Sequence, residues 1–229
     1  MTLHIGIVAC SAEGAALCYR AICAEGAHLL GVHAHPEVSM HTPSFSDYVA
    51  CLDRGDWQGV GDLMLASAEK LARIGADFLI CPDNTIHQAL PLVEGRSPLP
   101  WLHIAEVVAR KAIRRGFKSI AITGTRWLVD SEVYPQKLEA SGLKYLRPTD
   151  SERDELHRII MQELVRGDFR PESVVCFQRV IGRMKADGCD AVILGCTEIP
   201  LIIDDGSSPL PTLDSTRLLA LAALERAIS

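Results

Sequence analysis

The pattern of apolar and polar positions predicts short buried strands that alternate with helices. The apolar run from Ile5 to Ala9 is typical of a buried strand, and residues 13–24, rich in alanine and leucine, predict a helix after it. Leu29 to Ala34 predicts a second strand. Residues 63–74 carry apolar side chains at helical spacing and lead into a strand at Phe78. This order is typical of an α/β fold with parallel sheets.

Two less regular stretches interrupt this alternation. Residues 35–47 combine two prolines with many polar residues and predict a long loop, of the kind that often closes over a site. A helix is expected within residues 83–90. Its start fits a capping box, in which the Thr85 hydroxyl accepts from a first-turn amide and Gln88 reaches back.

The chain also contains an internal repeat, which predicts two similar α/β halves. Residues 75–85 recur without a gap as residues 188–198, each with a Gly-x-Asp start, an apolar run and a polar cluster. Two further pairs of segments match at nearly the same separation: residues 4–11 with 119–126, and 100–105 with 211–216. Three matches at one spacing indicate a duplication. We place the first half at 1–105 plus 210–229 and the second at 106–209.

The repeat aligns Asp83 with Cys196, each just after an apolar strand. Ligands of open α/β sheets bind at the carboxyl ends of the strands. Across a cleft, these two groups would reach one small molecule from opposite sides, which is the geometry of stereoinversion. Alone, Asp83 is equally well explained as a helix cap, and a cysteine after a strand as an inert apolar residue. Their matched positions favour the catalytic interpretation, with Cys81 as a reserve candidate.

Composition narrows the class of protein. The chain has 229 residues and a net charge of −6, which argues against nucleic acid or an anionic membrane as a partner. Neither a signal peptide nor a membrane span is indicated, so we expect a cytoplasmic protein with reduced thiols. No Cys-x-x-Cys pair is present, and the histidines at 33, 35 and 41 are best explained as polar loop residues, so we predict no metal. No nucleotide-binding motif appears, and no cofactor is predicted.

Two motifs carry a resemblance to a known family. Gly195-Cys-Thr-Glu-Ile199 resembles the second catalytic motif of the aspartate/glutamate racemase superfamily, and Asp83-Asn-Thr-Ile-His87 resembles the first. The resemblance covers essentially the whole chain. It implies two pseudo-symmetric Rossmann-like halves, each a parallel sheet flanked by helices, with the active site in the cleft between them. It also implies an isomerase that needs no pyridoxal phosphate, acts on an amino acid or related carboxylate, and is often a dimer.

The resemblance further implies roles for single residues. Cys196 is one of two opposing acid/base groups, and Asp83 stands where the family usually has the other cysteine. The residues implied to hold the substrate carboxylate are Ser11, Asn84, Thr85, Thr125 and Thr197. Arg166 lies where some relatives place a basic substrate ligand, and a solvated arginine at a helix end is the alternative explanation.

The departures from the family pattern leave alternatives open. A carboxylate has a reference pKa about 4 to 5 units below that of a thiol, so Asp83 is the weaker base unless burial raises its pKa. No Lys or Arg lies between Arg20 and Arg54, so selectivity for aspartate or glutamate is not predicted. A second interpretation is an enzyme resembling arylmalonate decarboxylase, with Cys196 as sole proton donor. A third is a small-acid binding protein without catalysis.

Overall fold

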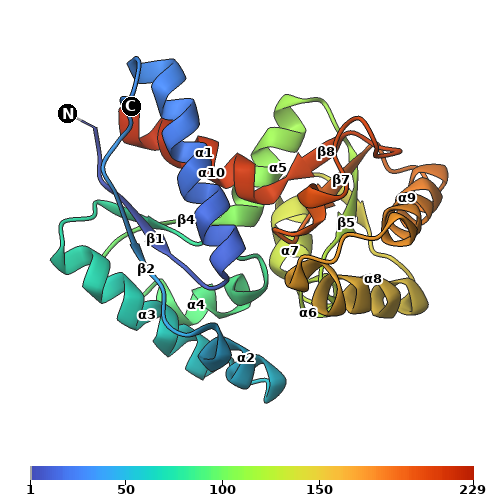
Figure 1. The fold of residues 1–229 in the computed structure, drawn as a ribbon, viewed down its shortest axis with the longest axis horizontal. Helices are drawn as coiled ribbons and strands as arrows, with labels where there is room; N and C mark the ends of the chain where they lie inside the picture. The colour runs from blue at the N-terminus through green and yellow to red at the C-terminus, as the bar shows by residue number, and fades with distance from the viewer. Residues whose placement is uncertain (1) are drawn as a thin grey trace. The chain divides into compact units, whose positions relative to one another are not determined.

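The protein, described here by a computed structural model covering residues 2–229, folds into two compact units (Figure 1). The first unit runs to Ile104 and includes Thr216–Ser229, and the second comprises Ala105–Ser215. Strand β8 (Thr212–Asp214) pairs with β7 (Ala191–Leu194), which places residues 212–214 in the sheet of the second unit. The first unit is therefore built from two separate stretches of chain, whereas the second is continuous.

The first unit contains a four-stranded, all-parallel sheet in the order β2-β1-β3-β4. Its strands are β1 (Ile5–Val8), β2 (Val38–His41), β3 (Phe78–Ile80) and β4 (Trp101–Leu102). Every residue of β1 and β3 is buried, as their continuous apolar runs predict. The register sets Ile7 beside Ile80, so these two central strands end at the same edge of the sheet.

Helices flank this sheet on both faces, and Figure 1 shows α1 on one side of it and α3 with α4 on the other. The helical segments are α1 (Ala12–Leu30), α2 (Phe45–Asp53), α3 (Trp57–Arg73), the 3-10 turn η1 (Thr85–Ala89), α4 (Leu90–Val93) and α10 (Ser215–Ile228). The predicted helices over 13–24 and 63–74 are confirmed, each as part of a longer helix. The core beneath α3 includes Met64, Leu71, Leu79 and Ile86.

The predicted second strand at Leu29 to Ala34 is wrong. Helix α1 continues to Leu30, and apolar residues at its end and just after it lie in solvent, with Leu29 59% and Val32 83% exposed. The real strand, β2, lies inside the predicted loop at 35–47. An edge strand is only partly covered, so it does not need the apolar run that marks a central strand.

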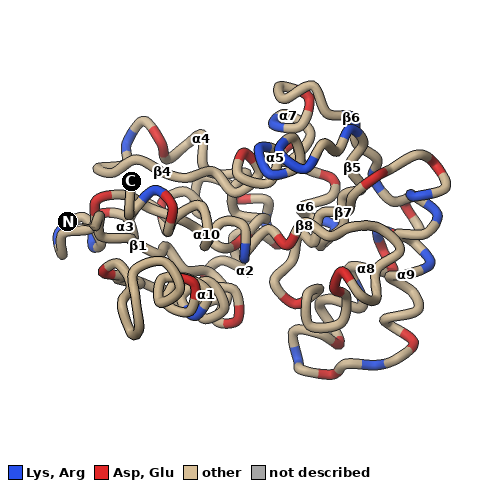
Figure 2. The backbone as a smooth tube through the Cα atoms, turned by 90° about the horizontal axis from the view of Figure 1, so that it is seen from above, with Lys and Arg blue, Asp and Glu red and all other residues tan. Residues whose placement is uncertain are grey.

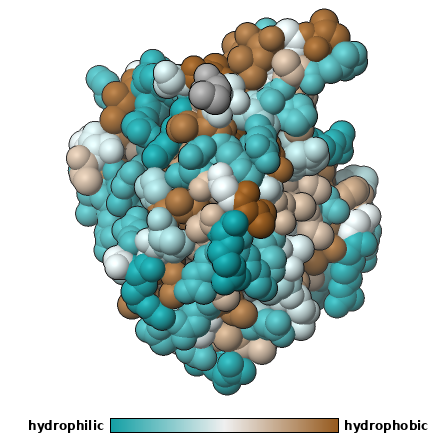
Figure 3. All heavy atoms as spheres, turned by 90° about the vertical axis from the view of Figure 1, so that its left-hand side faces the viewer, coloured by the Kyte–Doolittle hydropathy of each residue, from teal (hydrophilic) through white to brown (hydrophobic). Residues whose placement is uncertain are grey.

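Figure 3 shows the face of the molecule seen from the left of Figure 1, mainly hydrophilic with apolar residues gathered at its upper edge.

The second unit repeats the topology of the first. Its sheet is again four-stranded and all-parallel, in the order β6-β5-β7-β8. Beside β7 and β8 it contains β5 (Ser119–Thr123) and β6 (Lys144–Leu146). In each sheet, the strand that comes first in the sequence of its unit lies between the second and the third. This shared order confirms the two similar α/β halves that the sequence repeat predicts.

Seven helical segments accompany the second sheet: α5 (Ile104–Arg114), α6 (Arg126–Val129), α7 (Val133–Ala140), α8 (Asp150–Gln162), η2 (Leu164–Arg166), α9 (Pro171–Ala186) and η3 (Ile199–Leu201). Helices α8 and α9 bury Leu156, Ile160 and Phe177 in the core with Val192 of β7. Acidic and basic positions are interspersed in both units (Figure 2). Within residues 2–229, no helix combines the length and apolar character needed to cross a bilayer.

A partly buried ion pair connects α8 to α9. Glu152 completes a capping box with Thr149 at the start of α8. Its two carboxylate oxygens accept from the Nε and Nη2 atoms of Arg183 on α9, at 2.8 and 2.6 Å. Burial alone would raise the pKa of Glu152, but Arg183 and the Thr149 amide outweigh it and hold that pKa below its usual value.

Candidate active site

The first group of candidate residues lies where β1 and β3 end. Ser11 follows β1 and caps α1, because its side chain accepts a hydrogen bond from the Gly14 amide at 3.3 Å. Asp83 follows β3 after Cys81 and Pro82. Since β1 and β3 are parallel neighbours, both side chains belong to the same edge of the sheet. This is the edge at which α/β sheets bind ligands.

Asp83 fixes the start of the short turn that follows it. Its Oδ1 atom accepts a hydrogen bond from the Ile86 amide at 3.2 Å, while the side chain stays partly exposed. Gln88 does reach back, but through its Nε2 atom, which donates to the Thr85 carbonyl at 3.2 Å, whereas in a capping box the Gln side chain accepts from a backbone amide. Asp83, one residue before the N-cap Asn84, thus supplies a side-chain acceptor for a first-turn amide, the role that the expected capping box gave to Thr85. Asn84 and Thr85 are buried beside it, at 3% and 8% exposure.

His87 holds the backbone of Asp83 from within the unit. Its Nδ1 atom lies 2.7 Å from the Asp83 carbonyl oxygen, and its Nε2 atom accepts from the Ile104 amide at 3.3 Å. A donor at Nδ1 and an acceptor at Nε2 assign the neutral tautomer with the proton on Nδ1. The ring is buried and lies 4.9 Å from the His103 ring, centroid to centroid. The sequence motif contained His87, but its anchoring role emerges only from the fold.

A tyrosine that sequence reasoning missed is buried near the same strand ends. Tyr48 of α2 is fully buried and packs in one cluster with Cys10 and Cys81. Its hydroxyl is buried and makes no hydrogen bond to any residue from 2 to 229. Burial raises the pKa of Tyr48, and the nearby Cys81, Cys10 and Asp83 raise it further, so the phenol stays protonated. Burial also raises the pKa of the Cys81 thiol, which weakens Cys81 as a reserve nucleophile or base.

The matching edge of the second unit lies where β5 and β7 end. The Gly195 amide donates to the Thr123 carbonyl at 3.0 Å, which extends the pairing of the two strands by one residue. A Cβ atom at Gly195 would lie 2.5 Å from that carbonyl oxygen, so only glycine fits here. The close approach brings Thr125 and Cys196 to the same edge. Thr125 is buried and caps α6, accepting from the Leu128 amide at 3.4 Å.

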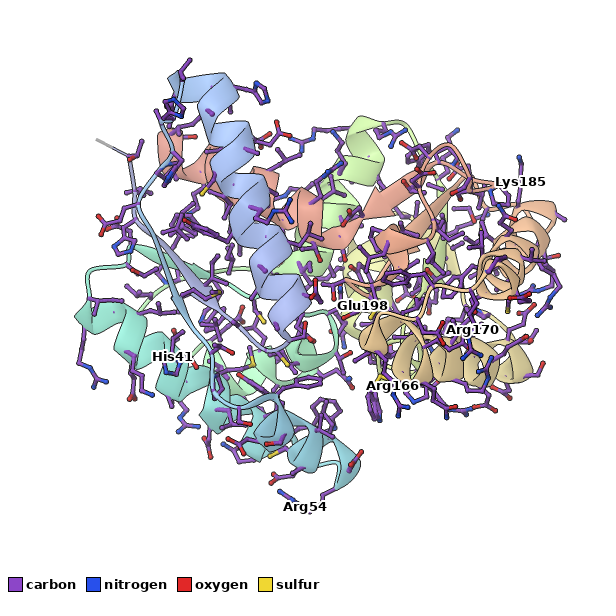
Figure 4. The ribbon with its side chains drawn as sticks, in the orientation of Figure 1. His41, Arg54, Arg166, Arg170, Lys185 and Glu198 are labelled. Atoms are coloured by element: carbon purple, nitrogen blue, oxygen red, sulfur yellow. The ribbon has the colours of Figure 1, made fainter. Side chains whose placement is uncertain are left out.

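Cys196 lies directly against a buried carboxylate. Its Sγ atom donates to Oε2 of Glu198 at 2.8 Å, and the Thr197 hydroxyl donates to the same oxygen at 2.8 Å. Glu198, labelled in Figure 4, is 5% exposed, whereas Cys196 is partly exposed. No Lys, Arg or His of residues 2–229 forms an ion pair with Glu198. The sequence motif contained Glu198, but sequence reasoning gave it no role and assigned Thr197 to the substrate.

Arg166 ends the 3-10 turn η2 and is followed by Gly167, whose φ of 74° closes the turn in the left-handed conformation. Its side chain is exposed and labelled in Figure 4. The guanidinium makes no hydrogen bond or ion pair with the part of the chain that the structure describes. A substrate contact by Arg166 therefore stays a prediction.

The histidines at 33, 35 and 41 do not assemble a metal centre. Among residues 2–229, no group of three or more His, Cys, Asp or Glu side chains is placed to hold an ion. His41 instead accepts from the Lys70 ammonium at its Nε2 atom, at 2.9 Å, and contacts the Ser67 hydroxyl through Nδ1 at 3.0 Å. Burial and the Lys70 charge both lower the pKa of His41.

Comparison with known proteins identifies the family. A model of the Asp/Glu/hydantoin racemase family matches residues 7–223. The broad specificity amino-acid racemase RacX of Bacillus subtilis is 25% identical over 160 residues, which cover 69% of this chain and 67% of that protein. A candidate Asp/Glu racemase from Yersinia pestis has a solved structure with a TM-score of 0.92 and 29% identity, covering 99% of this chain and 100% of its own. The solved structure of an aspartate racemase homologue from Pyrococcus horikoshii OT3 has a TM-score of 0.86 and 26% identity, with both chains fully covered.

The chain belongs to the Asp/Glu/hydantoin racemase family, since the family model spans nearly its whole length. The resemblance carried by the two motifs is thereby confirmed. The protein is an enzyme of the isomerase class.

Proposed function

We propose that the protein is a cofactor-independent amino-acid racemase or epimerase in which Asp83 and Cys196 are the opposing acid/base residues. The observation that carries this proposal is the equivalence of their positions. Each follows the third strand of its own sheet, in two sheets with the same strand order. Each is also partly exposed among buried neighbours, so a substrate can reach it.

In this mechanism one group removes the α-proton and the other delivers a proton to the opposite face of the planar intermediate. When Asp83 is the base, it takes the proton and Cys196 gives one up, so the total charge of the pair does not change. A carboxylate is the weaker base by about 4 to 5 pKa units in reference conditions, so the two half-reactions differ in their limiting steps. The equilibrium between enantiomers is unaffected, because a catalyst cannot alter it.

The hydroxyl and amide side chains at the two sheet edges are suited to a substrate carboxylate. They are Ser11, Asn84 and Thr85 in the first unit, and Thr125 and Thr197 in the second. Arg166 adds a cation whose side chain is open to solvent. The relative RacX is described as having broad specificity, which supports testing many amino acids instead of aspartate and glutamate alone. We also propose a homodimer, which light scattering after size-exclusion chromatography would test.

Proton NMR in deuterium oxide tests the proposed activity. The wild-type protein is incubated with L- and D-amino acids and an arylmalonate, beside Cys196→Ala and Asp83→Asn. We expect the α-proton signal of at least one amino acid to disappear and its enantiomer to appear on chiral chromatography, with both variants inactive in inversion. Cys23→Ala is the matched control, because Cys23 is also partly exposed but lies in α1.

Other outcomes separate the alternatives. Exchange without inversion would show that Asp83 does not complete the second proton transfer. Decarboxylation of the arylmalonate that depends on Cys196 would favour the single-cysteine enzyme. Activity that survives Cys196→Ala would refute the proposed assignment.

A further inference from the structure

The carboxylate of Glu198 is placed to control the protonation of Cys196. One oxygen, Oε2, accepts from both the Cys196 thiol and the Thr197 hydroxyl, each at 2.8 Å. The side chain is 5% exposed and has no cationic partner among residues 2–229. Two uncharged donors therefore bind this buried carboxylate, where a cation would be the more usual partner.

Electrostatics decides which form of Cys196 this arrangement favours. Loss of the thiol proton would place a thiolate against the buried carboxylate of Glu198 at hydrogen-bond distance. A like charge at such a distance disfavours the ionised form. The hydrogen bond from the Cys196 thiol to Glu198 exists only while the proton is present, so it acts in the same direction.

We propose that Glu198 keeps Cys196 in its thiol form before substrate binds, so that Cys196 begins the reaction as the acid and Asp83 as the base. The assignment of Cys196 as acid and Asp83 as base rests on the proposed function. The effect of Glu198 on the Cys196 thiol is tested without it. Glu198 is a positioning residue, because it acts through Cys196. In the first half of the cycle Asp83 gains the α-proton and Cys196 gives its own to carbon. The starting state is restored when Asp83 loses its proton to solvent and Cys196 regains one.

Alkylation of Cys196 measures this effect without any substrate, since the thiolate is the nucleophile. The rate with iodoacetamide is followed across a pH series by mass spectrometry of the Cys196 peptide, in the wild type, Glu198→Gln and Glu198→Asp. We expect Glu198→Gln to lower the midpoint pH by at least about one unit, which makes alkylation about tenfold faster below both midpoints. Glu198→Asp keeps the charge and is expected to stay near the wild type. An unchanged or higher midpoint in Glu198→Gln would overturn the inference.

Internal controls keep the test decisive. Cys23 is partly exposed and lies in the first unit, so its alkylation profile is expected to be identical in every variant. Buried Cys189 reports unfolding of the second unit. Should Glu198→Gln not fold, Thr197→Val removes a hydrogen bond to Glu198 but keeps its charge. Its midpoint is expected at or above that of the wild type, and a lower midpoint would overturn the inference.

Alkylation and isotope exchange answer separate questions. A lowered midpoint in Glu198→Gln together with absent α-proton exchange would reject the proposed racemase but not the control of Cys196 by Glu198. Normal exchange in the wild type together with an unchanged midpoint would reject only the control.

Discussion

Replacing Gly195 with alanine should damage the second unit at the point that presents Cys196. The added Cβ atom would lie 2.5 Å from the Thr123 carbonyl oxygen and 2.6 Å from Cδ2 of Leu128. The first distance is about 0.9 Å short of the 3.4 Å at which contacts become ordinary. Leu128 can turn away, but the carbonyl belongs to the backbone of β5. The ends of β5 and β7 must therefore separate, which weakens the hydrogen bond from the Gly195 amide to Thr123.

The expected cost follows from this geometry. Overpacking of a well-packed site costs about 1 to 3 kcal/mol. For a chain of this size, such a cost lowers the melting temperature by about 2 to 12 °C. Gly182 in α9 provides a matched control, because its added Cβ would come no closer than 4.0 Å to Pro209. Alanine in a helix interior is favoured over glycine by about 0.5 to 1 kcal/mol, so Gly182→Ala should melt at or above the wild-type temperature.

Thermal melting followed by circular dichroism compares the three proteins. The Cys196 alkylation rate at pH 7 is measured on the same samples, because displacement of the strand end should change the contact between Cys196 and Glu198. A Gly195→Ala protein that melts at the wild-type temperature, with an unchanged Cys196 rate, would refute the argument that the backbone contact requires glycine. A similar loss in Gly182→Ala would show that any added methyl group destabilises this unit.

Three further outcomes are expected. Tyr48→Phe removes a buried hydroxyl that has no hydrogen-bond partner among residues 2–229. The free energy of unfolding should therefore stay constant or rise by about 1 kcal/mol in urea titration, and a clear loss would contradict this. Glu152→Gln breaks the paired bonds to Arg183 and should lower the free energy of unfolding by about 1.5 to 3 kcal/mol, with an unchanged urea midpoint as the contrary result. His41 has a lowered pKa in the folded protein, so stability should fall as pH drops below the unfolded value of 6.5, where the unfolded chain binds the proton first. This loss between pH 7.5 and 5.5 should be smaller in His41→Asn, and an equal loss would exclude His41 as its source.

The central strands could be predicted from the sequence, because they are buried on both faces and therefore apolar throughout. The edge strand β2 could not, because it has no continuous apolar run and its polar side chains, Ser39 and His41, find their partners far along the chain. Ser39 contacts Nε2 of His4 at 2.9 Å, and His41 contacts Ser67 of α3. The exposed apolar end of α1 at Leu29 misled the prediction for the same reason. Local pattern does not report which residues tertiary contacts will cover.

The candidate site shows a similar division. The repeat was enough to align Asp83 with Cys196, because duplicated strands end in equivalent positions. The partners of these residues were not predictable. Glu198 was part of the sequence motif, but the motif does not indicate its partner. Its contact with Cys196 depends on how the turn after β7 folds back. Tyr48 had no sequence signal at all, since its burial against Cys10 and Cys81 depends on the packing of α2.

The discontinuity of the first unit has a consequence for synthesis on the ribosome. Helix α10 belongs to the first unit except for its first residue, and Arg226 lies 4.7 Å from the ring of Phe78 in β3. The Leu3 amide donates to the Ala227 carbonyl at 2.8 Å. The first unit therefore lacks a structural element until residues 216–229 are translated, whereas the second has all its residues once Ser215 has emerged. Because domains fold as units during translation, the later-encoded half is the one that can finish folding first.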